Sequence, residues 1–202
     1  YDSGGNIIEQ NEYFEDGSLS VKSIYEYVDG NNVRIIDYNS KGQITKEVTN
    51  EFDDNGNQTL RIEYIWNTQS FVPDRKSEST YDDNGNQTLF IQYIWDSVIE
   101  VFYEFSKEMK SYDEFGYVLD YEKHYWIQEL SQMKPVNKTV YSTLSETETN
   151  LVREGIIYEY DTNFNTWNEL EGEEFKSYFY YTKTSSLSTN SVELNSFSIY
   201  PN

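Results

Sequence analysis

One fifteen-residue stretch occurs twice in this chain of 202 residues and constrains its fold more than any other feature. Residues 52–66 read FDDNGNQTLRIEYIW, and residues 81–95 read YDDNGNQTLFIQYIW, so twelve of the fifteen positions are identical at a spacing of 29 residues. Each copy holds an Asn-Gly pair, followed by alternating apolar and polar residues that end on Trp. Alternation with a period of two is typical of a half-buried β-strand. The repeated unit is therefore predicted to be a β-hairpin.

The turn of each copy contains Asn55-Gly56 or Asn84-Gly85. Asn-Gly is the preferred pair of a two-residue type I′ hairpin turn, in which both central residues have positive φ. We therefore expect positive φ at both residues of each pair. The apolar positions that follow should share one face of their strand; they are Leu60, Ile62, Tyr64 and Trp66 in the first copy and Leu89, Ile91, Tyr93 and Trp95 in the second.

The same pattern extends along most of the chain. An aromatic residue begins each unit at Phe52, Tyr81, Tyr112 and Tyr141, at spacings of 29, 31 and 29 residues. The chain has no Ala, the best helix former, but 20 Tyr, 11 Phe and 4 Trp, which favour strands. We predict an all-β antiparallel meander of about twelve strands, built from stacked hairpin repeats of about 30 residues in a twisted or curling sheet.

The net charge of −21 limits the classes of partner. Nucleic acids and anionic membrane surfaces are bound through Lys and Arg, so neither is expected as a partner. No apolar run approaches the roughly 18 residues of a membrane-spanning helix, which argues against membrane insertion. Cys is absent, so the fold is not held by disulfides. Most of the acidic residues are expected to form a solvated surface, with divalent cations as the alternative.

Three segments are expected in the chain: a hairpin repeat domain at 1–181, a linker rich in Ser and Thr at 182–195, and the start of another domain at 196–202. Residues 1–6 resemble the turn of a repeat that is entered midway. This start predicts that the sequence is a fragment or a processed form.

The last six residues, Phe-Ser-Ile-Tyr-Pro-Asn at 197–202, follow the polar linker. They resemble the opening of a type IX secretion C-terminal sorting domain, an aromatic strand that leads into Tyr-Pro-Asn-Pro. The resemblance covers only these six residues. It implies recognition of the tail by the type IX secretion machinery, export across a Gram-negative outer membrane, and release or anchoring at the outer cell surface.

The repeat itself, an aromatic-Asp start, a Gly-Asn pair and an alternating strand, is similar to the YD repeats of bacterial surface proteins. The similarity covers most of residues 1–181 and is strict only at 52–66 and 81–95. The periods here are longer than those of the common YD repeat. The resemblance implies stacked hairpins, and a fold alone does not define a function.

Trp66, Trp95 and Trp126 are the candidate binding residues, since each stands 14 residues after its own aromatic start. They could form a ladder that stacks against sugar rings or another extended ligand. The alternative is a structural core, because equivalent positions of stacked repeats pack on one another. The core interpretation predicts that Trp66 and Trp95 are buried alike and that Trp126 differs.

Calcium is the one cofactor considered. Asp53, Asn55 and Asn57 place oxygen ligands at alternate positions, as do Asp82, Asn84 and Asn86 in the second copy. An EF-hand loop has its Gly at the sixth position and a Glu at the twelfth, whereas the Gly here is the fourth residue. A side-chain-stabilised turn is the alternative, and we expect no bound cofactor or metal.

The sequence presents no catalytic motif. His124 is the one histidine, which excludes a two-His metal site, and no Gly-x-Ser-x-Gly sequence supplies a nucleophile. Acidic residues are too numerous for a glycosidase pair to be chosen among them. Ser97, within Asp96-Ser97-Val98, fits the short O-glycosylation pattern of bacteria that use type IX secretion.

These observations favour a secreted or surface-displayed, non-catalytic repeat protein that binds an extracellular glycan or a surface protein, or that acts as a spacer. The alternative is an extracellular hydrolase that acts on a polysaccharide or another polymer. A cleft with converging carboxyl groups whose pKa values are driven apart would favour the enzyme. Exposed aromatic rows without such a cleft would favour binding.

Overall fold

The computed structural model describes residues 1–127, 132–141, 145–146, 150–161, 166–170 and 176–182. The chain divides into two compact units, Tyr1–Lys107 and Glu108–Asn202, and the boundary falls inside strand β8. Strands account for all regular structure among the described residues. The predicted linker and tail lie outside the described residues, apart from Thr182, the last residue of β14.

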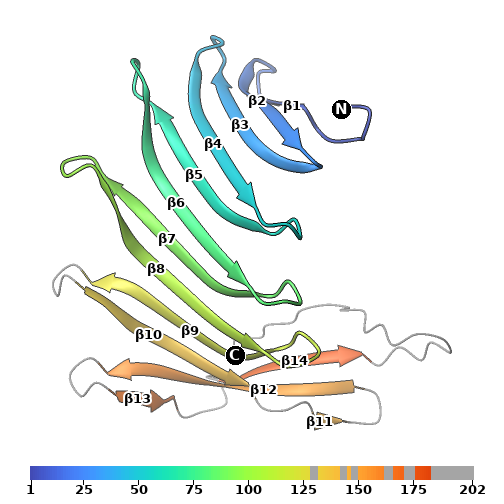
Figure 1. Cartoon of the computed structure of the whole chain (residues 1–202), viewed down its shortest axis with the longest axis vertical. Helices are drawn as coiled ribbons and strands as arrows, with labels where there is room; N and C mark the ends of the chain where they lie inside the picture. Colours follow the sequence, from blue (N-terminus) through green and yellow to red (C-terminus); the bar gives the residue numbers. More distant parts are fainter. Residues whose placement is uncertain (128–131, 142–144, 147–149, 162–165, 171–175, 183–202) are drawn as a thin grey trace. The chain divides into compact units, whose positions relative to one another are not determined.

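The first unit is an antiparallel meander in which neighbouring strands are consecutive in the sequence. Figure 1 shows β2 to β7 bending along their length, as expected for a twisted sheet. Its strands are β1 (Glu9–Tyr13), β2 (Leu19–Val28), β3 (Asn31–Asn39), β4 (Ile44–Phe52), β5 (Gln58–Trp66), β6 (Phe71–Tyr81), β7 (Gln87–Asp96) and the first part of β8 (Val101–Tyr112). The predicted all-β antiparallel meander is confirmed.

The second unit also consists of antiparallel strands, but its order departs from a simple meander. Strand β12 pairs with β10 and β11, and both β13 and β14 pair with it as well. Its strands, after the end of β8, are β9 (Val118–Ile127), β10 (Gln132–Tyr141), β11 (Ser145–Glu146), β12 (Asn150–Asp161), β13 (Thr166–Glu169) and β14 (Lys176–Thr182). The long β12 is thus the strand on which the C-terminal pairings converge.

The repeated turns have a different geometry from the predicted one. Gly56 and Gly85 have φ of 83° and 82°, as expected, but positive φ does not extend to Asn55 or Asn84. The Gly56 N–H donates to the Asp53 carbonyl at 3.0 Å, and the Asp53 N–H donates to the Asn57 carbonyl at 2.9 Å. This is a type I turn closed by a left-handed Gly, which forms a three-residue loop with a bulge.

The two-residue type I′ prediction is therefore wrong for Asn55-Gly56 and Asn84-Gly85. The observed turn differs because of the preceding Asp53. The Asp53 carboxylate accepts hydrogen bonds from the backbone N–H groups of Asn55 and Asn57 at 3.0 and 2.8 Å. These bonds stabilise the longer loop, because they satisfy two turn donors at once. A turn with positive φ at both central residues occurs instead at Asp29-Gly30, between β2 and β3.

The core of the first unit is small. Its buried apolar residues are Ile36, which is 8% exposed, and Val48, which is 2% exposed. Ile36 lies opposite Ile24 and Glu47, whereas Val48 lies opposite Ile35 and Glu63, one residue further along the ladder. Successive positions of a strand point to opposite faces, so the two residues lie on different sides of the sheet. The described part of this unit is a single-layer sheet with two partly solvated faces.

Candidate binding face

The hydrogen-bonded register places the alternating residues of both copies on one face of the first unit, which we call the repeat face. On β6, Lys76 lies between Ile62 of β5 and Tyr93 of β7. Glu78 lies between Leu60 and Ile91 in the same way. Residues directly opposite each other in a ladder share a face. The repeat face therefore alternates apolar stripes on β5 and β7 with a charged stripe on β6.

The charged and aromatic residues of this face form one connected group, the Lys76 cluster, made of Lys76, Glu78, Tyr93, Trp95 and Phe102. The Lys76 ammonium lies 4.0 Å from the centre of the Tyr93 ring and 5.5 Å from that of Phe102, in cation–π geometry. It donates to one Glu78 oxygen at 2.9 Å, and the Tyr93 hydroxyl donates to the other at 2.7 Å. Both carboxylate oxygens of Glu78 are thus engaged.

These contacts shift the pKa values of the cluster. The hydrogen bonds from Tyr93 and Lys76 lower the pKa of Glu78, so its carboxylate stays ionised. Burial, followed by the hydrogen bond to Glu78, raises the pKa of Tyr93 and keeps its hydroxyl protonated. The cluster therefore holds its charges at neutral pH and does not supply a proton donor of carboxylic type. Its properties suit recognition of hydroxyl groups and ring faces.

Trp66 and Trp95 occupy equivalent places at the ends of β5 and β7. Each indole meets a Phe across the following loop in an edge-to-face pair: Trp66 with Phe71 at 5.1 Å, and Trp95 with Phe102 at 5.0 Å between ring centres. Both Trp residues are half-buried. They are alike, as the core interpretation predicted, but neither is fully buried, because a single-layer sheet leaves one side of each ring uncovered.

Trp126 lies in the second unit, on β9, opposite Met133 of β10. The residue opposite it is therefore Met, where Trp66 has Phe71. Trp126 is half-buried, as Trp66 and Trp95 are, so the structure does not show the predicted difference in its burial. A related pair in the same unit is Tyr160 with Trp167, at 5.1 Å. The three candidate Trp residues thus divide into an equivalent pair in the first unit and one residue in the second.

Sequence reasoning identified the Trp residues but missed the residues that contact them. Phe71 and Phe102 were detectable, because each is an aromatic residue at or near the start of the strand after a Trp. Lys76 and Glu78 carried no such signal. Their place opposite Tyr93 and Ile91 follows from the pairing of β6 with β7. An extra residue, Asp74, shifts the pairing of β6 with β5.

The opposite face of the first unit is held by different contacts. Glu63 accepts salt bridges from Lys46 at 2.7 Å and from Arg61 at 2.9 Å. Two strands further on, the Ser106 hydroxyl donates to the Gln92 side chain at 2.8 Å, and Ser106 is only 1% exposed. Polar pairs of this kind hold the sheet where no second layer covers it.

The turn carboxylates are engaged within their own loops. One oxygen of Asp53 accepts the two backbone bonds given above, and the other accepts the Asn57 side-chain amide at 3.0 Å. Asp82 makes the same contacts with Asn84 and Asn86. These bonds lower the pKa of both Asp residues. Among the described residues, no group of three or more His, Cys, Asp or Glu could hold a metal ion.

His124 lies on β9 of the second unit, and Ser97 lies in the loop between β7 and β8 of the first unit. The His124 ring contacts Glu122 two residues earlier on β9, at 2.6 Å. Ser97 is exposed in the loop between β7 and β8, where the Asp96 carboxylate accepts the Val98 N–H at 2.8 Å. The neighbouring Val98 is 88% exposed. Ser97 is therefore accessible at a loop tip.

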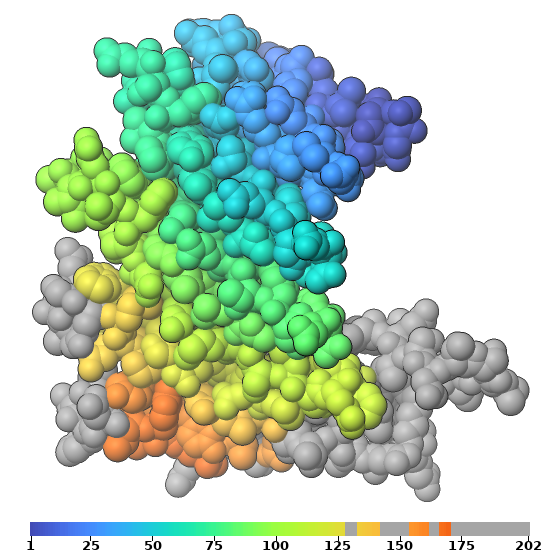
Figure 2. Space-filling view, in the orientation of Figure 1, coloured from blue at the N-terminus to red at the C-terminus, as the bar shows by residue number. Residues whose placement is uncertain are grey.

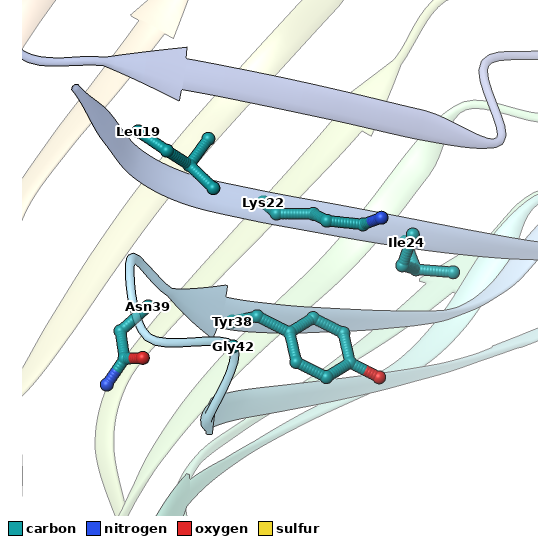
Figure 3. Close-up of a pocket in the computed structure, with 6 residues that line it drawn as sticks. All are labelled: Leu19, Lys22, Ile24, Tyr38, Asn39 and Gly42. Carbon is teal, nitrogen blue, oxygen red and sulfur yellow. The ribbon is translucent and has the colours of Figure 1, made fainter.

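The described surface of the first unit is corrugated rather than deeply hollowed on the side seen in Figure 2. One shallow pocket of about 310 Å³ lies between β2 and β3 (Figure 3), lined by Leu19, Lys22, Ile24, Tyr38, Asn39 and Gly42. Lys22 is paired there with Glu9 at 2.8 Å. Its lining has no carboxylate, so this pocket does not hold the carboxyl pair of a glycosidase.

In the part of the chain that the structure describes, no helix has the length and apolar character needed to span a membrane. No protein-family model matches the sequence, and no curated protein matches it.

Three solved structures resemble parts of the fold. A protein of unknown function from Bacteroides fragilis aligns with a TM-score of 0.43 and 17% identity, covering 62% of this chain and 90% of that one. A DUF3836 family protein from Bacteroides vulgatus aligns with a TM-score of 0.40 and 9% identity, covering 52% and 98%. A DUF3836 family protein from Parabacteroides distasonis aligns with a TM-score of 0.37 and 10% identity, covering 54% and 90%.

Proposed function

We propose that this protein is a secreted or surface-displayed, non-catalytic binding protein whose repeat face takes an extended glycan. The observation that carries the proposal is the equivalence of Trp66–Phe71 and Trp95–Phe102, half-buried aromatic pairs at the same place in consecutive hairpins. A periodic row of partly exposed rings suits a ligand that is itself periodic. Aromatic rings supply the apolar faces on which sugar rings stack.

The spacing of the two Trp residues supports a polymer rather than a small ligand. They lie on β5 and β7, with β6 between them. Neighbouring strands are about 4.8 Å apart, so the two positions are about 10 Å apart across the strands. They are also staggered along the strands, because Trp66 lies opposite Phe71, whereas Ile94, the residue before Trp95, lies opposite Arg75. A ligand that contacts both indoles must therefore be longer than a single sugar ring.

The charged stripe supplies the polar half of the site. Lys76 and Glu78 lie between the two apolar stripes, with their charges fixed by Tyr93 and by each other. Preorganised charged groups form stronger hydrogen bonds to ligand hydroxyls than neutral groups do. Net negative charge makes a neutral glycan a better ligand than a polyanionic one, because like charges repel.

The carboxyl groups support binding rather than catalysis. The pKa is lowered at seven carboxyl groups of the first unit: Asp2, Glu9, Asp16, Asp53, Glu63, Glu78 and Asp82. A glycosidase needs one carboxyl group with a raised pKa to protonate the leaving oxygen. The proposal for the outer cell surface draws on the tail at 197–202 and its resemblance to a sorting domain.

The binding proposal is tested by titrating the protein with a panel of soluble neutral and acidic polysaccharides while recording its Trp fluorescence. We expect saturable changes with one class of neutral glycan and at least a tenfold loss of affinity in Trp95→Ala. The matched control is Phe90→Ala, which removes an aromatic ring from the opposite face of the same strand. Equal losses in both variants, or no binding to any glycan, would overturn the proposal.

The proposed localisation is tested separately, on cells that express the full-length gene product. Protease added to intact cells should degrade the protein if it is displayed on the surface. If the protein is released instead, it should be found in the culture medium. Protection of the protein until the cells are lysed would contradict the surface assignment.

A further inference from the structure

Both copies of the repeat carry an Asn-Gly pair in an exposed turn, Asn55-Gly56 and Asn84-Gly85. Asn is a thermolabile residue, and it deamidates most readily before Gly, which has no side chain to hinder the reaction. The Gly nitrogen attacks the side-chain carbonyl carbon of Asn and closes a five-membered imide, while the side-chain amide nitrogen leaves as ammonia. Water then opens the ring to aspartate or isoaspartate. Sequence and exposure alone would mark both pairs as deamidation sites.

The folded turn holds the attacking nitrogen in a hydrogen bond. The Gly56 N–H donates to the Asp53 carbonyl at 3.0 Å, and the Gly85 N–H donates to the Asp82 carbonyl at 3.0 Å. This nitrogen must lose its proton before it can attack, and the hydrogen bond opposes that loss. In a type I turn the second central residue, here the Asn, has a ψ of about 0°. Ring closure requires a large rotation from this ψ, and the rotation breaks the turn bond.

The Asp side chain resists the same rotation. One oxygen of Asp53 accepts the backbone N–H groups of Asn55 and Asn57 at 3.0 and 2.8 Å, and the other accepts the Asn57 side-chain amide at 3.0 Å. Asp82 makes the equivalent contacts in the second copy. Because these bonds lower the pKa of both Asp residues, the carboxylates stay ionised at the mildly alkaline pH where deamidation is fast. The turn is therefore fully anchored under those conditions.

We propose that each repeat turn protects its own Asn-Gly pair, so that Asn55 and Asn84 deamidate only when their turn opens. Modification is then governed by the local stability of the turn and not by exposure. Isoaspartate adds a carbon to the main chain and would disrupt the turn, and either product adds a negative charge beside Asp54 or Asp83. The inference does not depend on the proposed ligand, because it rests on the turns alone.

The first test follows deamidation at each site by peptide mass spectrometry, during incubation of the 202-residue chain at mildly alkaline pH. The folded chain is compared with the same chain in guanidinium chloride at the same pH and temperature. We expect both sites to react at least tenfold more slowly in the folded chain. Equal rates in the two states would overturn the proposal.

The second test assigns the protection to the turn. Asp53→Ala removes the side-chain bonds that anchor Asn55 and should speed deamidation there several-fold, while Asn84 in the same molecule stays slow. The matched control is Asp54→Ala, which removes an adjacent carboxylate that is exposed and has no hydrogen-bond or ion-pair partner among the described residues. This control should leave the rates at both sites unchanged.

Circular dichroism and the melting temperature show whether Asp53→Ala folds as Asp54→Ala does. If it does not, Asp82→Ala replaces it and is read at Asn84, with Asn55 as the control within the same molecule. A folded variant whose own Asn reacts no faster than in Asp54→Ala would overturn the proposal. Equal acceleration at both Asn residues of a folded variant would also overturn it, because global unfolding would then control the reaction.

Discussion

Strands β5 and β7 belong to copies of one sequence, and the positions at which they differ are as informative as those they share. Within the fifteen-residue repeat, the differing pairs are Phe52 and Tyr81, Arg61 and Phe90, and Glu63 and Gln92. The last two pairs lie on the face opposite the repeat face. On β5 and β7, every apolar residue of the repeat face is the same in both copies, and the difference between Phe52 and Tyr81 lies on the neighbouring strands.

The two varied positions are stabilised by different chemistry. In β5, Arg61 and Glu63 form an ionic network with Lys46. In β7, Phe90 is apolar, and Gln92 accepts a hydrogen bond from the buried Ser106. The opposite face therefore tolerates a change from ionic to neutral contacts, whereas the repeat face keeps one pattern. This contrast supports the repeat face as the functional surface.

The largest expected effect concerns the residues that are shared. Trp66→Ala and Trp95→Ala should each lower the free energy of unfolding by about 2–4 kcal/mol, from lost burial and the lost edge-to-face contact with Phe. Urea unfolding measures both. The two values should agree within about 1 kcal/mol, because each Trp makes the same edge-to-face contact with a Phe. A large difference between them would break the equivalence of the two copies.

The shared turns come next. Gly56→Val and Gly85→Val should each cost about 1–3 kcal/mol, because a β-branched residue is strained at φ near +80°. An added Cβ would meet one side-chain oxygen at an ordinary contact distance of 3.7 Å, that of Asn31 at Gly56 and that of Asn57 at Gly85, so backbone strain is the main cost. Gly→Asn at the same sites is the control and should cost less, since Asn tolerates positive φ. Equal costs for Val and Asn would contradict the assigned turn.

The Trp residues and the turns also show how much of the structure could be predicted from the sequence. The repeat located the turns, the strands and the shared face, because alternation and turn residues act locally. The repeat did not predict the turn type, because the Asn-Gly pair alone does not define it. The Asp53 side chain also bonds to the loop and stabilises the longer turn. The repeat could not foresee half-buried Trp residues, because burial depends on whether a second layer covers the sheet. The Lys76 cluster joins side chains of β6, β7 and β8, and contacts of this kind between strands leave no motif in the sequence.

A smaller effect is expected where the copies differ. Burial acts to raise the pKa of Glu63, but the hydrogen bonds from Lys46 and Arg61 outweigh it, and the net shift is downward. The stabilisation is therefore present above the unfolded pKa of about 4.3 and is lost as the pH falls through the lower folded value. Glu63→Gln, which copies the residue at 92, should cost about 0.5–1 kcal/mol at neutral pH and less in acid.

Unfolding curves recorded from neutral to acidic pH test this prediction. The native chain and Glu63→Gln should converge in stability as the pH falls. A constant difference at every pH would show that the charge of Glu63 is not what stabilises this position. Gln92→Glu is the reciprocal variant; it places a carboxylate beside Ser106 without a described cation partner at that position.

The smallest effect concerns Tyr81, the third difference between the copies. Its hydroxyl donates to the Gln58 carbonyl at 2.9 Å, whereas Phe52 has no such group. Tyr81→Phe should lower the free energy of unfolding by about 0.5–1.5 kcal/mol, the net value of one hydrogen bond. Phe52→Tyr should not destabilise the chain by a comparable amount. Thermal unfolding of the two variants separates these outcomes, and equal losses would show that the hydroxyl bond is not the cause.

The central claim, that the repeat face is the ligand-binding surface, is tested most directly by footprinting of aromatic side chains with and without glycan. Oxidative labelling followed by mass spectrometry reports the accessibility of each ring in the intact protein. The account predicts that a bound neutral polysaccharide protects Trp66 and Trp95 together and leaves Phe90 on the opposite face unchanged. Protection of Phe90, or labelling of both Trp residues that glycan does not alter at saturating concentration, would contradict it.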